Sequence, residues 1–496
     1  MNLKNKPLFK KIGGLALSIA VLCTSCGPAF AATGSPDTSA ARSLTIHKYR
    51  MEDIKKATTE GSGQQTDQVP ADAIPLPGIQ FKVTKMQDTD NTKVDTTWNI
   101  QIITTGADGS VTIQGNDNLP MGVYRIEEQT NPAVAEKADP CLVSIPLTNP
   151  AGDGWIYNVH VFPKNQIKPG PDIDKFVTEL ENKHDTADIS ERVKWIVETT
   201  LPDDIATCKN YTVSDVIDTR LDYVTGSVKV YRVDTGKKRV LMTPDCYTVT
   251  EPNTANNRTL TVSLTDTGKK TAAKSLLNTK DKNAVLNIEY NTFVNKPAEG
   301  SLGKPIPNGA TIHYTNNLDI FFEPQSVPED KKPEVHTGGI NLLKVDADDN
   351  TLKLQGAKFK IYRTEADAKK NINAVKDPAN NAIDWEVTTD ANGIAHFWGL
   401  AYYGDSTNYW IVETQAPIDN EGKPYNLLKY PVKVTVNSNS HAEANKIIVE
   451  NIKHYDLPYT GGTGSLTPLY MGAALILMAS GMSILFIRNK RNTGNK

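Results

Sequence analysis

One pattern of short β-strands occurs twice along this chain in the same order, and it constrains the fold more than any other feature. In each copy apolar and polar residues alternate over short runs, as in strands that bury one face. Residues 44–48, 78–83, 105–109 and 124–128 correspond in order to residues 340–344, 356–361, 389–393 and 409–413. Repeated order of this kind is typical of two copies of one structural unit. The sequence therefore predicts two related all-β domains, over residues 32–165 and 339–453.

The stretch between the two copies, residues 171–324, predicts a different β-rich domain. Many short strands at close spacing are typical of a β-sandwich. The expected strands are 173–178, 192–199, 211–217, 227–232, 247–250, 259–264, 284–294 and 311–322, and the one helical piece expected in this stretch lies near residues 268–277. Proline-containing connections at 164–172 and 325–338 are predicted to be linkers. A chain of 496 residues, at roughly 150 residues per domain, is thus predicted to be all-β, with three tandem β-sandwich domains.

Both ends of the chain carry apolar segments that indicate export and a membrane anchor. Lysines at positions 4, 6, 10 and 11 precede an apolar run at 12–23, and Ala29-Phe30-Ala31 provides a small-x-small cleavage site. Residues 1–31 are therefore predicted to be a signal peptide. Lipidation at Cys23 or Cys26 is the alternative, although neither cysteine follows a lipoprotein-like leucine. Near the other end, the apolar run at about 466–487 is long enough to span a bilayer, and the basic tail behind it would stay cytoplasmic.

Composition argues against several classes of function. The formal net charge of -3 gives no reason to expect nucleic acid or an anionic membrane as a partner. Cys141, Cys208 and Cys246 remain after the signal peptide, and Cys208 and Cys246 are a candidate disulfide pair because they fall in one predicted domain. The cysteine spacings and eight scattered histidines do not match a metal site, so no metal or other cofactor is expected. No Ser-His-Asp order or phosphate-binding loop stands out, so an enzyme is not expected.

A lysine lies among apolar residues on the inward face of the first strand of each predicted domain. These lysines are Lys48, Lys175 and Lys344. A lone buried ammonium group is very costly, so a lysine in this position needs a polar partner. For a single lysine, the simpler interpretation is a side chain that extends from an edge strand to solvent. Three lysines at the equivalent position favour buried, partnered groups.

Partners for Lys344 are found on matching strand faces. Glu413 shares a face with Tyr409 and Ile411, and Asn451 closes the last strand on the face of Val449. Residues 409–417, YWIVETQAP, resemble the "E-box" of Gram-positive pilins and of collagen-adhesin B-type domains. That resemblance implies immunoglobulin-like domains in which a lysine and an asparagine form an intramolecular isopeptide bond. It implies that Lys344 is the nucleophile, Asn451 the electrophile and Glu413 the proton shuttle.

The same resemblance extends the assignment to the other two domains. In the middle domain it implies a bond between Lys175 and Asn308 with Asp215 as the shuttle, since Asp215 faces inward with Tyr211 and Val213. Asn316, on the same face as Asn308, is the alternative electrophile. In the first domain the repeat predicts Lys48, Glu128 and Asn165, although some N-terminal domains of the family lack the bond.

Two further motifs resemble those of sortase-assembled major pilins. Residues 155–164, WIYNVHVFPK, resemble the pilin motif Trp-x-x-x-Val-x-Val-Tyr-Pro-Lys, with Phe162 in place of tyrosine, and imply that Lys164 is the linkage lysine. The sequence Leu457-Pro458-Tyr459-Thr460-Gly461, followed by the apolar run and basic tail, resembles the cell-wall sorting signal Leu-Pro-x-Thr-Gly. A sortase is then expected to cleave after Thr460 and to join Thr460 to Lys164 of another subunit.

The resemblance covers essentially the whole mature chain and implies the backbone subunit of a covalently polymerised pilus at the surface of a Gram-positive bacterium. Expected partners are identical subunits joined head to tail, pilin-class and housekeeping sortases, peptidoglycan, and tip or minor pilins. The sequence leaves a host surface ligand open. The alternative function is a wall-anchored monomeric adhesin or minor pilin, which would not need Lys164.

Overall fold

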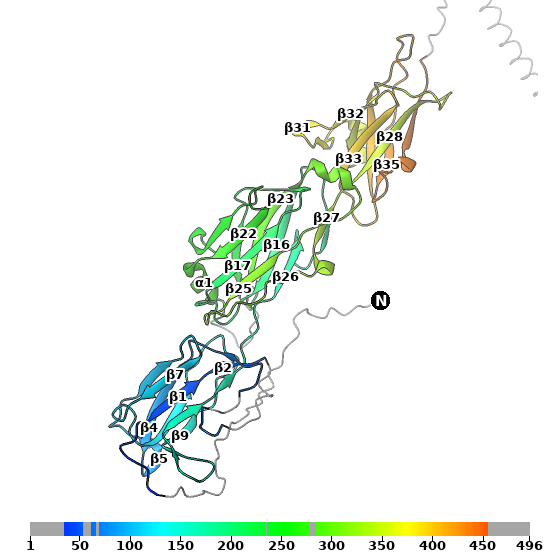
Figure 1. Ribbon diagram of the computed structural model, residues 1–496. Coiled ribbons are helices and arrows are strands. Elements are labelled where there is room, and N and C mark those ends of the chain that lie inside the picture. Colours follow the sequence, from blue (N-terminus) through cyan, green and yellow to red (C-terminus); the bar gives the residue numbers. More distant parts are fainter. Residues whose placement is uncertain (1–33, 53–60, 66–68, 235, 277–283, 455–496) are drawn as a thin grey trace, which may run out of the picture. The chain divides into compact units, whose positions relative to one another are not determined.

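The computed structural model describes residues 34–52, 61–65, 69–234, 236–276 and 284–454 (Figure 1). These residues divide into two compact units: one runs to Gly339 and includes 398–407 and 435–441, and the other holds 340–397, 408–434 and the chain from 442 onward. Within the described ranges, no helix is long and apolar enough to cross a membrane. The predicted signal peptide, transmembrane run and residues 457–461 lie outside them.

The N-terminal part of the first unit is built from short strands. They are β1 (Ser43–His47), β2 (Tyr49–Arg50), β3 (Ile74–Pro75), β4 (Gln80–Gln87), β5 (Asp90–Val94), β6 (Gln101–Thr104), β7 (Ser110–Gln114), β8 (Gly122–Glu128), β9 (Cys141–Ile145), β10 (Leu147–Thr148), β11 (Trp155–Ile156), β12 (Asn158–Val161) and β13 (Lys164–Asn165). One sheet has the order β12-β1-β7 and another the order β5-β4-β8-β9. The first strands of this part lie beside its last strands, because β1 pairs in parallel with β12 and β2 with β13.

The middle part of the first unit contains two larger sheets, and Figure 1 labels several of their strands. The elements are β14 (Ile173–Val177), β15 (His184–Thr186), β16 (Arg192–Thr200), β17 (Asn210–Val216), β18 (Leu221–Tyr223), β19 (Lys229–Val233), β20 (Arg239–Leu241), β21 (Tyr247–Thr250), β22 (Thr259–Leu264), α1 (Asp266–Ala273), β23 (Val285–Val294), β24 (Ile306–Pro307), β25 (Thr311–Thr315), β26 (Gln325–Ser326) and β27 (Glu334–His336). The sheets have the orders β14-β16-β23-β19-β20 and β21-β22-β17-β25-β26. Inward residues of both sheets, among them Trp195, Val213 and Ile288, form one apolar cluster.

The second unit repeats the arrangement of the N-terminal part. Its elements are β28 (Gly338–Asp346), β29 (Lys358–Tyr362), α2 (Glu365–Lys370), β30 (Lys376–Asp377), β31 (Asn380–Asp384), β32 (Glu386–Thr388), β33 (Ile394–Leu400), β34 (Thr407–Gln415), β35 (Val432–Val436) and β36 (Ile447–Asn451). The sheets have the orders β33-β28-β36 and β32-β29-β34-β35. Here too the first strand, β28, pairs in parallel with the last, β36.

Most expected strands of the middle part are present, and several elements differ from the sequence expectations. The strand expected over 311–322 ends at Thr315, because the chain turns at residues 316–320. Residues 325–338, expected to be a linker, contain β26 and β27, and β27 pairs with both β15 and β24. The helix expected near 268–277 is α1, which begins two residues earlier, and α2 has no counterpart in the prediction.

Candidate functional site

The second unit brings Lys344, Glu413 and Asn451 together in its core, where their exposed fractions are 0%, 2% and 1%. In the parallel pair of β28 and β36, Lys344 lies opposite Val449 and Asp346 opposite Asn451. Lys344 and Asn451 therefore lie two residues out of register on one face of the sheet. Asn451 Nδ2 donates to both carboxyl oxygens of Glu413 at 3.0 Å, and Lys344 Nζ donates to Val449 O at 2.9 Å.

Burial controls the ionisation of this site. Loss of hydration lowers the pKa of Lys344 to about 8, against the opposing attraction of Glu413. Loss of hydration also raises the pKa of Glu413, although hydrogen bonds from Leu428 N and Asn451 oppose the change. Both shifts favour the uncharged forms, because a buried charge is poorly solvated. A neutral amine is the form that can attack a carbonyl carbon.

A turn glycine holds the backbone of the lysine in both repeated parts. Lys344 N donates to Gly393 O at 2.7 Å, and Lys48 N donates to Gly109 O at 2.8 Å. Both glycines have positive φ, and a Cβ at Gly393 would lie 2.4 Å from Lys344 O. A larger residue would therefore strain the turn and push against the strand that carries the lysine.

The N-terminal part contains an equivalent site, formed by Lys48, Glu128 and Asn165. Lys48 Nζ donates to Glu128 Oε2 at 2.7 Å, and Asn165 Nδ2 donates to Glu128 Oε1 at 2.5 Å. All three side chains are buried. Burial lowers the pKa of Lys48 to about 8, opposed by the charge of Glu128. The carboxyl group thus bridges the amine and the amide.

The middle part places Lys175, Asp215 and Asn308 around a fourth residue, Tyr290. Lys175 Nζ donates to Asp215 Oδ2 at 2.5 Å, to Tyr290 Oη at 2.8 Å and to Gly309 O at 3.0 Å. Asn308 Nδ2 donates to Tyr290 Oη at 2.8 Å, and Tyr290 Oη donates to Asp215 Oδ2 at 2.5 Å. Burial lowers the pKa of Lys175 to about 8, against the attraction of Asp215. Asn308 is 1% exposed.

The alternative electrophile, Asn316, is buried but is used by a turn. Its Oδ1 accepts hydrogen bonds at 3.0 Å from both Leu318 N and Ile320 N. Asn308, by contrast, contacts the residue that also binds Lys175 and Asp215. Of the two asparagines, the geometry therefore favours Asn308.

Sequence reasoning did not identify Tyr290. It lies on β23, opposite Trp195 of β16, and its side chain is 1% exposed. A buried tyrosine usually finds a partner for its hydroxyl group, and this was the available signal. The sequence of a strand with one tyrosine does not reveal which partner that is.

The three sites share an arrangement that supports condensation of an amine with an amide. In each, the side-chain carbonyl oxygen of the asparagine is buried and has no hydrogen-bond partner among the described residues. Buried polar atoms are nearly always hydrogen-bonded, so three exceptions at equivalent asparagines need an explanation. Each asparagine amide lies beside an uncharged amine and a carboxyl group, and its carbonyl oxygen has no hydrogen bond that stabilises it. This arrangement favours nucleophilic attack of the amine on the amide.

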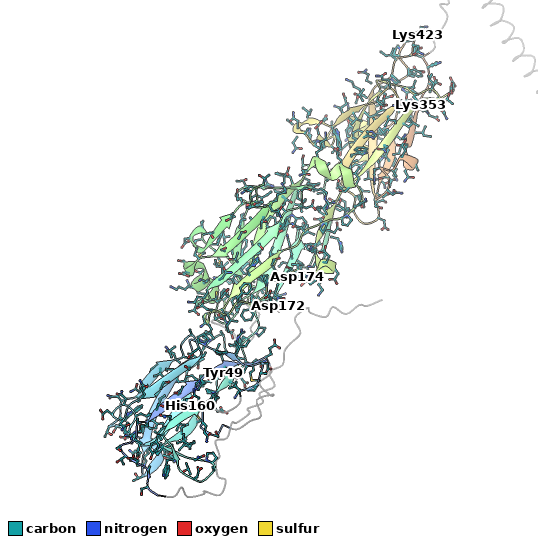
Figure 2. The ribbon with its side chains drawn as sticks, in the orientation of Figure 1. Tyr49, His160, Asp172, Asp174, Lys353 and Lys423 are labelled. Carbon is teal, nitrogen blue, oxygen red and sulfur yellow. The ribbon has the colours of Figure 1, made fainter. Side chains whose placement is uncertain are left out.

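Lys164 lies at the end of the N-terminal part, on β13. Its register partner in β2 is Tyr49, labelled in Figure 2. The Lys164 side chain is half-buried, and Nζ donates to Phe162 O at 3.1 Å, whereas the neighbouring Asn165 is 0% exposed. The two residues therefore face opposite sides, as strand alternation predicts. The other half of the predicted linkage, Thr460 within 457–461, lies outside the described residues.

The described cysteines are all free thiols. The candidate disulfide between Cys208 and Cys246 is not formed. Cys208 Sγ instead donates to Ile205 O, and Cys246 Sγ contacts Thr243 Oγ1 at 3.4 Å. The prediction of this disulfide was wrong, because two cysteines in one domain form a disulfide only if their Cα and Cβ atoms lie at the right distance and direction. Within the described ranges, no cluster of histidine, cysteine or acidic residues could hold a metal ion.

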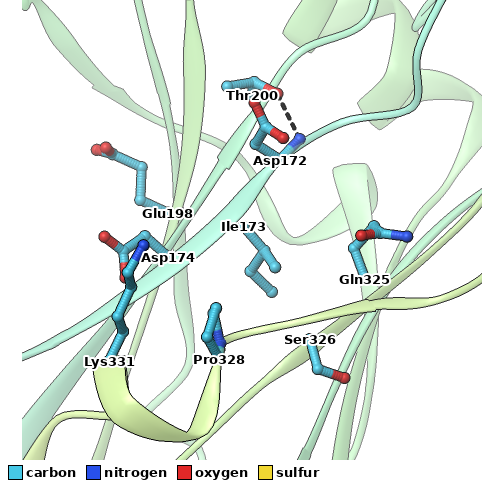
Figure 3. A pocket seen from close by; sticks show the side chains of 9 residues that line it. All are labelled: Asp172, Ile173, Asp174, Glu198, Thr200, Gln325, Ser326, Pro328 and Lys331. Atoms are coloured by element: carbon cyan, nitrogen blue, oxygen red, sulfur yellow. Dashed lines mark hydrogen bonds between the residues drawn. The ribbon is translucent and has the colours of Figure 1, made fainter. Parts of the chain in front are cut away.

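A cavity of about 250 Å³ lies near the start of β14, apart from the Lys175 site (Figure 3). Its wall includes Asp172, Asp174, Glu198 and Lys331. Asp172 N donates to Thr200 Oγ1 at 2.8 Å across one side of it. Asp174 is paired with Lys183, so part of its acidic wall is already neutralised.

Comparison with known proteins agrees with this geometry. Residues 39–166 match the model of the Gram-positive pilin subunit D1, N-terminal domain, and residues 338–450 match a prealbumin-like fold domain. The chain is 26% identical to fimbrial subunit type 1 of Actinomyces viscosus, covering 96% of this chain and 97% of the relative. It is also 26% identical to fimbrial subunit type 2 of Actinomyces naeslundii, covering 98% and 96%.

Solved pilus proteins are also similar to this chain. The full-length RrgB pilus protein of Streptococcus pneumoniae is 17% identical, with 86% of this chain and 100% of that chain covered at a TM-score of 0.49. The fimbrial protein FimP from "Actonomyces oris" is 23% identical, with 86% and 100% covered at a TM-score of 0.40.

The fold, the buried lysine sites and the domain matches define a Gram-positive pilin, a structural rather than an enzymatic protein of the cell surface. The chain is homologous to the Actinomyces fimbrial subunits along nearly its whole length, and it is a fimbrial subunit of the Gram-positive cell surface. The prediction of a pilus or fimbrial subunit of the Gram-positive cell surface is therefore confirmed.

Proposed function

We propose that this pilin is polymerised through Thr460 and Lys164 and is stabilised by three internal isopeptide bonds. The bonds join Lys48 to Asn165, Lys175 to Asn308 and Lys344 to Asn451, one in each of three immunoglobulin-like β-sandwiches over 32–165, 171–324 and 339–453. The observation that supports this proposal best is the recurrence of one buried trio: a lysine of lowered pKa, a carboxyl group and an asparagine.

Each internal bond forms by exchange of one nitrogen for another. The uncharged lysine Nζ attacks Cγ of the asparagine, and a C–N bond forms as the carbonyl oxygen takes up negative charge. The carboxyl group accepts a proton from Nζ and returns a proton, directly or through a neighbouring hydroxyl group, to Nδ2, which leaves as ammonia. The fold supplies proximity, which can lower such a barrier by roughly 7–11 kcal/mol. Atoms balance without any cofactor.

The link between subunits uses Lys164 and the predicted sorting sequence. A pilin-class sortase cleaves after Thr460 and holds its carbonyl as a thioester, which the Lys164 amine of the next subunit resolves. Because each subunit offers one amine and one carbonyl at different places, the contact does not close and a fibre results. A housekeeping sortase would join the last Thr460 to peptidoglycan, and tip or minor pilins would join the same fibre.

The internal bonds are tested by the mass of linked peptides from the full chain. Each bond removes one ammonia, about 17 Da, and digestion yields branched peptides that contain both bonded residues. Three branched peptides are expected, one for each site. Linear peptides at all three sites would overturn the proposal of internal bonds.

The intersubunit bond is tested by replacing Lys164 in the cells that make the pilus. Lys164→Ala is expected to abolish the ladder of high-mass polymers while leaving the monomer at the surface. Lys137→Ala, on an exposed lysine of the same part, is the matched control and should keep the ladder. A persisting ladder in Lys164→Ala would rule out Lys164 as the linkage residue.

A further inference from the structure

The middle site differs from the other two in how its asparagine is held. At the N-terminal and C-terminal sites the asparagine amide donates directly to the carboxyl group, Glu128 or Glu413. At the middle site the Asn308 amide donates to Tyr290 Oη, and Tyr290 Oη donates to Asp215 Oδ2. Among the contacts of the described residues, a tyrosine hydroxyl stands between the carboxyl group and the leaving nitrogen.

The difference follows from the length of the acidic side chain. Aspartate has one methylene fewer than glutamate, so Asp215 on β17 reaches Lys175 but does not bridge to Asn308. Tyr290 extends from β23 of the facing sheet and contacts all three groups, at 2.8 Å from Lys175 Nζ, 2.8 Å from Asn308 Nδ2 and 2.5 Å from Asp215 Oδ2. Its hydroxyl therefore occupies the place of the second carboxyl oxygen at the glutamate sites.

We propose that Tyr290 is a catalytic residue of the Lys175–Asn308 bond, which carries a proton between Asp215 and the leaving Nδ2 of Asn308. This inference rests on the proposed isopeptide function. Asp215 Oδ2 receives the proton that Lys175 loses, and Tyr290 Oη contacts Asn308 Nδ2, the nitrogen that must gain one.

The proton relay balances within the site. Lys175 Nζ forms a bond to Asn308 Cγ and passes a proton to Asp215 Oδ2. Tyr290 Oη gives its own proton to Nδ2 and takes the proton from Asp215, while the Cγ–Nδ2 bond breaks and ammonia leaves. The aspartate and the phenol finish in the states in which they began, so no other reactant is needed.

The surroundings keep the phenol protonated until it is used. Tyr290 is 1% exposed, and burial together with the neighbouring Asp215 raises its pKa well above the ordinary value. The ring centroid of Trp195 lies 5.1 Å from Lys175 Nζ, so the indole covers the amine. A group that keeps its proton in the resting site can donate it when negative charge develops on the tetrahedral intermediate.

The test follows formation of each bond separately after cell-free synthesis of the full chain, by quenching and measuring branched peptides. Tyr290→Phe is expected to slow the Lys175–Asn308 bond by about 100-fold, the lower range for general acid–base catalysis. The other two bonds should form at the wild-type rate, which also reports that the N-terminal part and the second unit fold. Tyr211→Phe is the matched control, because it removes a buried hydroxyl that bonds Thr199 and Thr200 instead.

A second substitution separates catalysis from simple positioning. 3,5-Difluorotyrosine at position 290 keeps the ring and hydroxyl but makes the phenol more acidic, so a relay should change the rate by more than about threefold. The same analogue at position 211 should leave the rate unchanged. A wild-type rate in Tyr290→Phe, or no response to the analogue, would overturn the relay. If the wild-type chain gives no Lys175–Asn308 peptide, the proposed function fails at this site and the relay fails with it.

Discussion

At the scale of single residues, the chemistry of the three sites depends on burying an amine beside a carboxyl group. Lys48, Lys175 and Lys344 are each 0% exposed and are among the largest fully buried side chains of the described residues. An isolated charge in that environment would cost several kcal/mol, so the sites are stable only as partnered groups or as bonded products. The carboxyl group thus serves both stability and reaction.

Replacing Glu413 by glutamine should separate these two roles. Glu413→Gln retains hydrogen bonding to Asn451 but removes proton transfer, so we expect the Lys344–Asn451 bond to be absent or slowed by at least about 100-fold. Branched-peptide mass spectrometry measures the effect. Glu450→Gln is the control, because Glu450 is exposed and precedes Asn451 on β36. In this variant the Lys344–Asn451 bond should form normally. Normal bonding in Glu413→Gln would exclude Glu413 as the shuttle.

Without the bond, the buried lysine should make stability depend on pH. In Asn451→Ala the bond cannot form, and the folded chain keeps Lys344 with a pKa of about 8, below the ordinary lysine value of 10.5. Between these values the unfolded chain binds more protons than the folded chain, so the free energy of unfolding rises with pH. Below about pH 8 the Lys344 amine is charged in both the folded and the unfolded chain. Its contribution to the free energy of unfolding is then constant and at its least favourable value.

Urea unfolding of Asn451→Ala at pH 7.5, 8.5 and 9.5 measures this dependence. The urea concentration at the midpoint of unfolding should increase with pH over that range. The double variant Lys344→Met, Asn451→Ala lacks the titrating amine, and its midpoint should change less. Equal slopes in the two variants would mean that Lys344 is not the group responsible.

The residues of the three trios could be predicted from sequence because strand alternation gives the face of each residue, and the resemblance to E-box domains selects the lysine, the carboxyl group and the asparagine. The geometry brings Lys344, Glu413 and Asn451 together as expected, and it does the same at the other two sites. Tyr290 was missed because its role depends on the distance between two sheets. Strand alternation gives the sheet face on which a side chain lies, but it does not identify the side chains of the facing sheet that contact it.

At the scale of elements, hydrogen bonds between side chains and nearby backbone groups set where helix α2 and strand β25 begin or end. Helix α2 carries a capping residue at each end: the Thr364 side chain accepts a hydrogen bond from Asp367 N, and Asn371 ends the helix in the left-handed conformation. Such capping residues are typical helix boundaries. β25 was predicted too long, because the apolar alternation continues through residues 318–322 although Asn316 closes a turn there.

The two buried asparagines of the middle part should therefore respond differently to removal. Asn316→Ala loses the two turn hydrogen bonds and is expected to lower the free energy of unfolding by about 1–3 kcal/mol per backbone amide left unpaired. It should keep the branched Lys175–Asn308 peptide. Asn308→Ala should lose that peptide. The opposite result, with the bond lost in Asn316→Ala alone, would assign the electrophile to Asn316.

At the scale of the whole molecule, the proposed linkage determines which bonds carry load. Tension would enter a subunit at Lys164 and leave at Thr460, so the path runs through the chain after residue 164. The Lys175–Asn308 and Lys344–Asn451 bonds lie on that path and bypass most of its length. The Lys48–Asn165 bond spans residues that lie almost entirely before Lys164, so it would stabilise a part that is not pulled.

Force spectroscopy between position 164 and the C-terminal side of 460 can separate these cases. In Asn308→Ala the roughly 130 residues between the bonded positions become extensible, which adds about 450 Å at about 3.4 Å per residue. Asn451→Ala frees roughly 107 residues and should add about 360 Å by the same measure. The added contour length is expected even if the part that carries the substitution is already unfolded before pulling. In the wild-type chain the isopeptide bond itself prevents the residues between the bonded positions from extending.

Asn165→Ala is the matched control, since it removes the same kind of bond outside the load path. Pulled from position 164, it should give the wild-type contour length, although a protease should cleave its N-terminal part faster than wild type. Added length in Asn165→Ala would mean that force enters upstream of Lys164 and would contradict the proposed linkage. Unchanged length in both Asn308→Ala and Asn451→Ala would mean that the internal bonds do not bear the tension of the fibre.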